Sequence, residues 1–212
     1  MLYEMLFSCS NEHYQKSTNN FKHCKMRSKK KNFMLIILCF SFSLVNAQYE
    51  IKPEKGYTPQ IGIMVDMLED LKDRITEITH DLDQAETDYL FDENANSIGA
   101  IIMHLIANES YYQVEFLQER TWTEKEEEFW GVAGDLGEKS RDLIKGKPIK
   151  YYLDLWDQVR KKTLEGLKAK DDEWFAASID EGLNNHYVWF HVLEHSANHM
   201  GQIALVKNRL PK

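Results

Sequence analysis

Four segments of the chain place apolar residues at alternating intervals of three and four, the spacing that puts side chains on one face of an α-helix. No segment of useful length alternates apolar and polar residues with the period of two that marks a half-buried strand. Amphipathic helices of this kind bury their apolar stripes against one another. The pattern therefore predicts an all-α fold, a four-helix bundle.

The ends of the four predicted helices carry recognisable signals. The first begins at Thr58 and Pro59, a cap residue followed by proline at the first helical position, and its stripe runs to Ile78. The second spans about residues 97–120, and the third spans about 149–168 directly after a proline. The fourth spans about 184–209 and is followed by Pro211, which cannot continue a helix.

A long connection, residues 121–147, joins the second and third helices. Antiparallel neighbours in bundles are usually joined by only a few residues. We therefore expect this connection to cross the bundle or to cover one of its ends. Its charged run, residues 124–128, is most simply the solvated face of a helix.

The segment before the first helix has the three parts of a secretory signal peptide. A basic cluster follows Met26, an apolar run occupies residues 33–45, and the small residue Ala47 precedes the expected cut. The apolar run is shorter than the roughly 20 residues that span a bilayer as a helix. We expect an N-terminal extension and signal peptide over residues 1–47, a linker over 48–57 and the bundle over 58–212.

This reading makes the protein exported, periplasmic or secreted, with no stable membrane span in the mature chain. We hypothesise that translation starts at Met26, because the residues before it add polar sequence ahead of the basic cluster. Cleavage leaves 165 residues with 19 basic and 32 acidic side chains, a formal charge of −13. Such a chain repels phosphate backbones, so we expect no nucleic-acid partner. Cys9, Cys24 and Cys39 all precede the cut, so the exported part has neither a disulfide nor a thiol nucleophile.

Histidines are concentrated in the fourth predicted helix, which holds His186, His191, His195 and His199. Two of them continue the apolar stripe of that helix, which reads Val188, Val192, His195, His199, Gln202 and Val206. Side chains four apart share one helical face, so both rings can approach the same point. Imidazoles buried without partners are costly, and a metal ion removes the cost by accepting a lone pair from each ring.

A metal site needs ligands from a facing helix as well, and the second helix offers His104. Three neutral imidazoles, His104, His195 and His199, would hold a divalent ion such as Zn²⁺ or Ni²⁺ and leave a position open for water or substrate. That arrangement is typical of catalytic sites. The alternative that these histidines merely form a polar network in the core stays open.

The remaining candidates have secondary roles. We expect His191 at the rim of the site, and His186 and His80 to be structural. Glu109 and Glu194 could accept hydrogen bonds from ligand imidazoles, although surface ion pairing is commoner for such residues. Sequence does not rank the residues that could move protons or orient a substrate, which are His191, Tyr111, Asn108 and Gln202.

Two motifs resemble those of the DinB-like superfamily of damage-inducible proteins. Residues 96–109, with His104, resemble its second-helix motif, and residues 195–203 resemble its fourth-helix motif, H-x-x-x-H-x-G-Q-[IL]. The resemblance covers roughly residues 58–210. It implies a metal-binding four-helix bundle, often a homodimer, with His104, His195 and His199 as ligands.

Relatives in that superfamily include thiol S-transferases that use low-molecular-weight bacterial thiols. Those relatives are cytoplasmic, whereas this chain carries an export signal, and an oxidising compartment offers little reduced thiol. The transferase activity of those relatives therefore cannot simply be carried over. We expect an exported metal-dependent enzyme, a hydrolase or a thiol S-transferase-like enzyme, that acts on a small molecule. The alternative is a non-catalytic protein of the cell envelope that binds metal or a partner.

Overall fold

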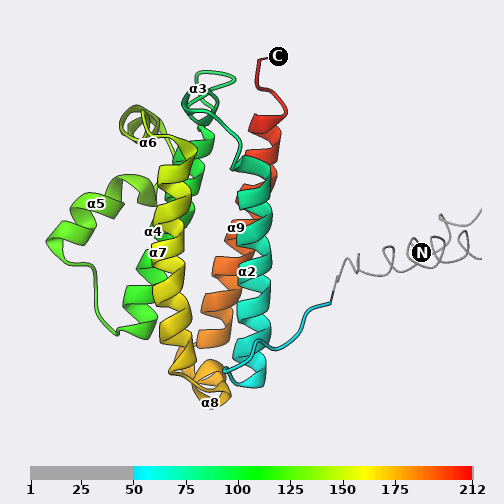
Figure 1. The fold of residues 1–212 in the computed structure, drawn as a ribbon. Coiled ribbons are helices and arrows are strands. Elements are labelled where there is room, and N and C mark those ends of the chain that lie inside the picture. The colour runs from blue at the N-terminus through cyan, green and yellow to red at the C-terminus, as the bar shows by residue number, and fades with distance from the viewer. Residues whose placement is uncertain (1–49, 212) are drawn as a thin grey trace, which may run out of the picture. The chain divides into compact units, whose positions relative to one another are not determined.

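The computed structural model describes residues 50–211, which form a bundle of four long helices (Figure 1). The expected signal peptide, its cut and the three cysteines lie outside the described residues. The long helices are α2 (Pro59–Thr79), α4 (Ile98–Tyr112), α7 (Ile149–Lys168) and α9 (Asn185–Lys207). A π-helical turn, η1 (Gln113–Leu117), continues α4. The all-α prediction is confirmed, and α7 has the bounds that its stripe predicted.

Side chains at the helix starts explain where the helices begin. The Ser97 hydroxyl accepts a hydrogen bond from the backbone N–H of Ala100, and the Asn184 side chain accepts one from Tyr187. These bonds satisfy N–H groups that have no partner within their own helix. The first turn of α2 is capped from a distance, because the Asp172 carboxylate accepts from the backbone N–H of Gln60.

The four helices pack as a closed ring in which α2 contacts α9, α9 contacts α4, α4 contacts α7, and α7 contacts α2. Each helix turns its apolar stripe inward. The largest fully buried side chains are Trp156, Trp189, Tyr152 and Phe175. This ring makes α4 and α9 neighbours, so residues on their facing stripes can meet.

The long connection folds into α5 (Glu124–Gly134) and α6 (Glu138–Leu143). Thr123 and Glu126 form a capping box that fixes the start of α5. Figure 1 shows α5 beside α4, and α5 packs on that helix instead of crossing the bundle or covering one of its ends. The physical reason lies in Trp130 and Ala133, which are buried in the same core cluster as α4. The charged run forms the outer face of α5, as predicted.

The remaining elements are short. They are α3 (Gln84–Thr87), α8 (Asp172–Ala176) and an antiparallel hairpin of β1 (Ser178–Asp180) and β2 (Leu183–Asn184). Gly182 has a φ of 77° in the hairpin turn, a conformation that favours glycine. This hairpin is the one sheet within residues 50–211, and it was not predicted because its strands are too short for an alternating pattern. None of the helices in that range is both long and apolar enough to cross a membrane.

Candidate metal centre

Three histidines from α4 and α9 point their Nε2 atoms at one another. Nε2 of His195 lies 3.1 Å from Nε2 of His104 and 2.9 Å from Nε2 of His199. Tetrahedral coordination of Zn²⁺ by imidazole places its nitrogens about 3.3 Å apart, since each Zn–N bond is about 2.0–2.1 Å. The three side chains that the sequence singled out are therefore brought together, and they could hold a metal ion.

The opposite nitrogens of two of these rings are fixed by oxygen acceptors. Nδ1 of His104 lies 2.8 Å from the backbone carbonyl oxygen of Ala133 in α5. Nδ1 of His199 lies 2.9 Å from Oε1 of Gln202, one turn further along α9. A carbonyl oxygen only accepts, so both Nδ1 atoms carry a hydrogen and donate it. In a neutral ring that assignment leaves Nε2 with a lone pair and no hydrogen.

This assignment makes the three histidines a poor hydrogen-bonded network and a good metal site. His104 and His199 both direct a bare lone pair at Nε2 of His195. A hydrogen on that atom of His195 can be donated to only one of them, so at least one pair of nitrogens has no hydrogen between them. A cation that accepts all three lone pairs removes the mismatch. The donor set thus fits a divalent ion better than it fits the polar-network alternative.

Burial keeps the site neutral. His104 and His199 are 9% and 8% exposed, and His195 is half-buried. Burial, followed by the neighbouring rings of His199, His104 and His191, lowers the pKa of His195 to about 4. Burial also lowers the pKa of His199, against the opposing effect of its hydrogen bond to Gln202. Neutral imidazole is the form that binds metal.

A row of aromatic rings leads away from the three histidines along α4 and α9. The His191 ring stacks on His195 with centroids 5.8 Å apart and planes 9° apart. Tyr112 contacts His191 at 5.7 Å, Tyr111 contacts Tyr112 at 5.5 Å, and Trp122 contacts Tyr111 at 5.6 Å. His191 thus lies next to His195, and the row of rings continues from it through Tyr112 and Tyr111 to Trp122.

Glu109, an expected partner of the ligand imidazoles, lies elsewhere. Its carboxylate accepts from Arg160 at 2.7 and 2.9 Å and from the indole N–H of Trp156 at 2.8 Å. The possible role as an imidazole partner is wrong, because Glu109 follows His104 by five residues, roughly 140° around the helix, and so faces α7 instead of α9. The alternative of an ion pair holds, although the pair with Arg160 is buried and not at the surface. Arg160 holds the pKa of this buried carboxyl below its usual value, even though burial alone would raise it.

Glu194 lies 3.8 Å from His191 and contacts no ligand ring, whereas Gln202 orients His199. His186 stacks on Phe175 at 4.4 Å, consistent with a structural role. Sequence reasoning missed the carbonyl of Ala133, because a backbone acceptor leaves no signature in the residue types.

Fold and site together define a helical-bundle protein with three histidines between two of its helices that could hold a metal ion. The chain belongs to the mycothiol-S-transferase family, whose model matches residues 63–211. This is a DinB-like family, so the resemblance found in the sequence is confirmed.

A crystal structure of a conserved protein from Enterococcus faecalis has a similar fold. The two chains are 15% identical with a TM-score of 0.56, and the match covers 69% of this chain and 94% of the other. At this identity the likeness extends to the fold alone. No curated protein matches the chain.

Proposed function

We propose that the protein is a metal-dependent S-transferase that joins the sulfur of a small thiol to an electrophilic small molecule. His104, His195 and His199 would hold one divalent ion. Family membership supports transfer to or from a thiol, and the convergence of three Nε2 atoms, two of them without a hydrogen, supports the metal assignment. Zn²⁺ or Ni²⁺ suits a site of neutral imidazoles.

The chemistry that a bound divalent ion supplies is to lower the pKa of a coordinated thiol, which makes a thiolate nucleophile available near neutral pH. In the overall transfer, a bond forms between the thiol sulfur and an electrophilic carbon of the second substrate. The bond from that carbon to its leaving group breaks, and the leaving group departs with the electron pair. The proton lost by the thiol balances its charge.

The residues of this chain would position the reacting groups. Ala133 and Gln202 hold the rings of His104 and His199 in one orientation through their Nδ1 atoms, so the lone pairs need no reorganisation. The aromatic rings of Tyr112, Tyr111 and Trp122, which follow His191 in a row, would offer surface against which the body of a substrate could pack. Hydrolysis by activated water is the competing reaction at such a site, and a direct test separates the two.

The test begins with protein purified without a histidine tag. Elemental analysis should find one equivalent of divalent metal, and His199→Ala should lose it. Conjugation of small thiols to an electrophile such as 1-chloro-2,4-dinitrobenzene is then measured beside ester and amide hydrolysis. Conjugation that rises and falls with metal content supports the proposal. Turnover of esters or amides alone would make the protein a hydrolase, and bound metal without any turnover would make it a non-catalytic binding protein.

We also propose that the chain is exported and cleaved after Ala47. The support is the basic, apolar and small-residue pattern of residues 26–47. N-terminal sequencing of protein recovered from its native cell should begin at Gln48. A recovered chain that retains residues 1–25 would overturn both the cleavage and the start at Met26.

A further inference from the structure

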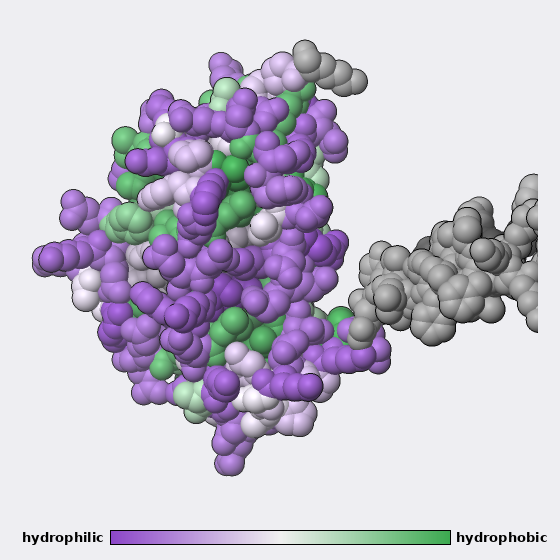
Figure 2. Space-filling view, in the orientation of Figure 1, coloured by the Kyte–Doolittle hydropathy of each residue, from purple (hydrophilic) through white to green (hydrophobic). Residues whose placement is uncertain are grey.

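A cavity lies beneath α5, between α4 and α7. Its volume is about 230 Å³, and α4, α5, α6, α7 and the α6–α7 loop surround it. The walls are mostly apolar, with Met103 from α4, Phe129 and Val132 from α5, and Tyr151 and Tyr152 from α7. Figure 2 shows apolar side chains over α5 and α6, beside further apolar patches on a surface that is largely hydrophilic.

Three large apolar side chains at the mouth of this cavity are exposed to solvent. Leu143 is 62% exposed, Phe129 is 47% exposed and Tyr151 is 36% exposed. Single exposed apolar residues are common, but three around one cavity mark a place where a ligand would bury them. The inner wall includes Tyr152, which is 1% exposed and whose hydroxyl has no hydrogen-bond partner within the described chain.

Two lysines define the charge that such a ligand would carry. Lys145 and Lys147 line the cavity, and neither takes part in the ion pairs found within residues 50–211. The Lys147 ammonium lies 5.5 Å from the centroid of the Tyr151 ring, which places it over the apolar wall. In a chain with a formal charge of −8, two unpaired lysines beside an apolar cavity favour an anion.

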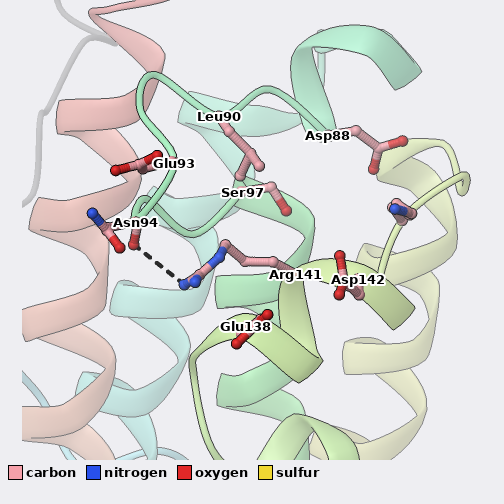
Figure 3. A pocket seen from close by; sticks show the side chains of 9 residues that line it. Asp88, Leu90, Glu93, Asn94, Ser97, Glu138, Arg141 and Asp142 are labelled. Carbon is pink, nitrogen blue, oxygen red and sulfur yellow. Dashed lines mark hydrogen bonds between the residues drawn. The ribbon is translucent and has the colours of Figure 1, made fainter.

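A neighbouring cavity differs in charge, because acidic side chains line it. It is lined by the carboxylates of Asp88, Glu93, Glu138 and Asp142, and Arg141 donates there to the backbone carbonyl of Asn94 at 3.3 Å (Figure 3). Lys145 lines both cavities, so the carboxylates of the neighbouring cavity partly offset its positive charge. Lys147 lines only the apolar cavity of the pair, and it is therefore the main determinant of anion preference.

We propose that the cavity beneath α5 is a binding site for a small carboxylate with an apolar body, a molecule of about a dozen non-hydrogen atoms. The apolar body packs on Met103, Phe129 and Val132, and the carboxylate lies at Lys147. This site is separate from the metal centre and does not depend on the proposed transferase activity.

The cavity and the metal centre are separate sites, but both are built partly from α4 and α5. Val132 lines the cavity, and the next residue, Ala133, gives its carbonyl oxygen to His104. On α4, Met103 lines the cavity and precedes His104 in the chain. A ligand that moved α5 would also move the acceptor that orients His104, and its binding would then alter metal affinity. Reciprocity requires metal to alter ligand affinity by the same factor.

The experiment uses 4-phenylbutyrate as the probe and neutral 4-phenylbutyramide as its matched partner. Isothermal titration of the metal-free, full-length protein measures both affinities before any metal is added. We expect the carboxylate to bind at least about threefold more tightly, the scale of one exposed charge pair. Lys147→Gln should abolish that preference. Lys150→Gln is the matched control, because Lys150 pairs with Asp154 and lies outside the lining.

A second variant locates the site. Val132→Trp fills the cavity and should weaken both probes, while circular dichroism confirms that it folds. The same titrations with Zn²⁺ then measure coupling in both directions. Equal affinity for the two probes, or binding that Val132→Trp leaves unchanged, would overturn the proposal. Lack of metal binding would overturn the proposed function and leave this result standing.

Discussion

Arg160 donates to both carboxylate oxygens of Glu109, through Nε at 2.7 Å and Nη2 at 2.9 Å, and the two side chains are 3% and 2% exposed. This bidentate pair crosses the core between α7 and α4. Arg160 also donates to the carbonyl of Leu68 and to Glu69, so it joins α2 to the same polar network. A pair this deep makes each partner depend on the other.

Removal of Arg160 alone should therefore strongly destabilise the fold. Arg160→Met leaves the Glu109 carboxylate buried without its cation, and we expect a loss of about 3–5 kcal/mol in the free energy of unfolding. Urea denaturation measures the loss. Lys161→Met changes the adjacent, exposed cation and should be nearly neutral. A double variant, Glu109→Leu with Arg160→Met, should recover part of the stability, and a loss larger than that of the single variant would contradict this reasoning.

Metal content should depend on each of the three convergent rings. Substitution of His104, His195 or His199 by alanine removes one lone pair from the site, and elemental analysis should find little metal after dialysis. His80→Ala is the control, since that ring lies at the end of α2, where its Nδ1 bonds to the nearby carbonyl of Glu77. Retention of a full equivalent by His104→Ala would remove α4 from the site.

Gln202 should act on the metal through His199. Gln202→Leu deletes the acceptor of the Nδ1 hydrogen and frees the ring to rotate, so metal affinity should fall about 10- to 100-fold. Gln202→Glu keeps an acceptor oxygen at the same distance and should restore most of the affinity. Competition with a chromogenic chelator measures both variants. Equal losses in the two would indicate that packing of the side chain matters instead of its hydrogen bond.

The metal-free protein should lose stability as the pH falls from about 6.5 to about 4. The pKa of His195 is lowered from 6.5 to about 4, and that of His199 is also lowered, so the unfolded chain binds more protons in this range. The stabilisation that these neutral rings provide is therefore fully present above the unfolded pKa of 6.5. It declines as the pH drops toward the folded pKa of His195, about 4. The pKa of Glu109 is lowered from 4.5, so its contribution is lost only at more acidic pH.

Urea titrations of chelator-treated protein across this range test the expectation. Replacement of both histidines, His195→Gln with His199→Gln, should flatten the profile between the two values. A wild-type curve that is already flat there would show that these rings are not held neutral by the fold.

The sequence predicts the bundle well because its helices are long and each buries a regular stripe. The extent of α7 follows from the proline before its first turn and from a buried stripe with intervals of three or four, formed by Tyr152, Trp156, Val159, Thr163 and Leu167. The meeting of His104 with His195 and His199 could also be predicted, because His195 and His199 replace apolar residues in the stripe of the last helix and His104 lies on the second helix that must face it.

The supporting contacts were harder to predict. The docking of α5 depends on two buried residues, Trp130 and Ala133, in a segment dominated by charge, and its decisive group is a backbone carbonyl. Glu109 carries the residue type of an imidazole partner but the wrong phase, which only the rotation of α4 reveals. Residue type suggests what a side chain can do, whereas helical phase and tertiary packing decide what it meets.

The contact between His104 and His195 joins positions 91 residues apart in the chain. An ion bound there would act as a reversible cross-link between α4 and α9, closing a loop that contains α5, α6 and α7. Because such an ion binds the native chain and not the unfolded one, its concentration adds to the stability of the whole bundle. The lifetime of the folded protein, and its resistance to proteases, would then vary with the metal supply of the compartment that holds it.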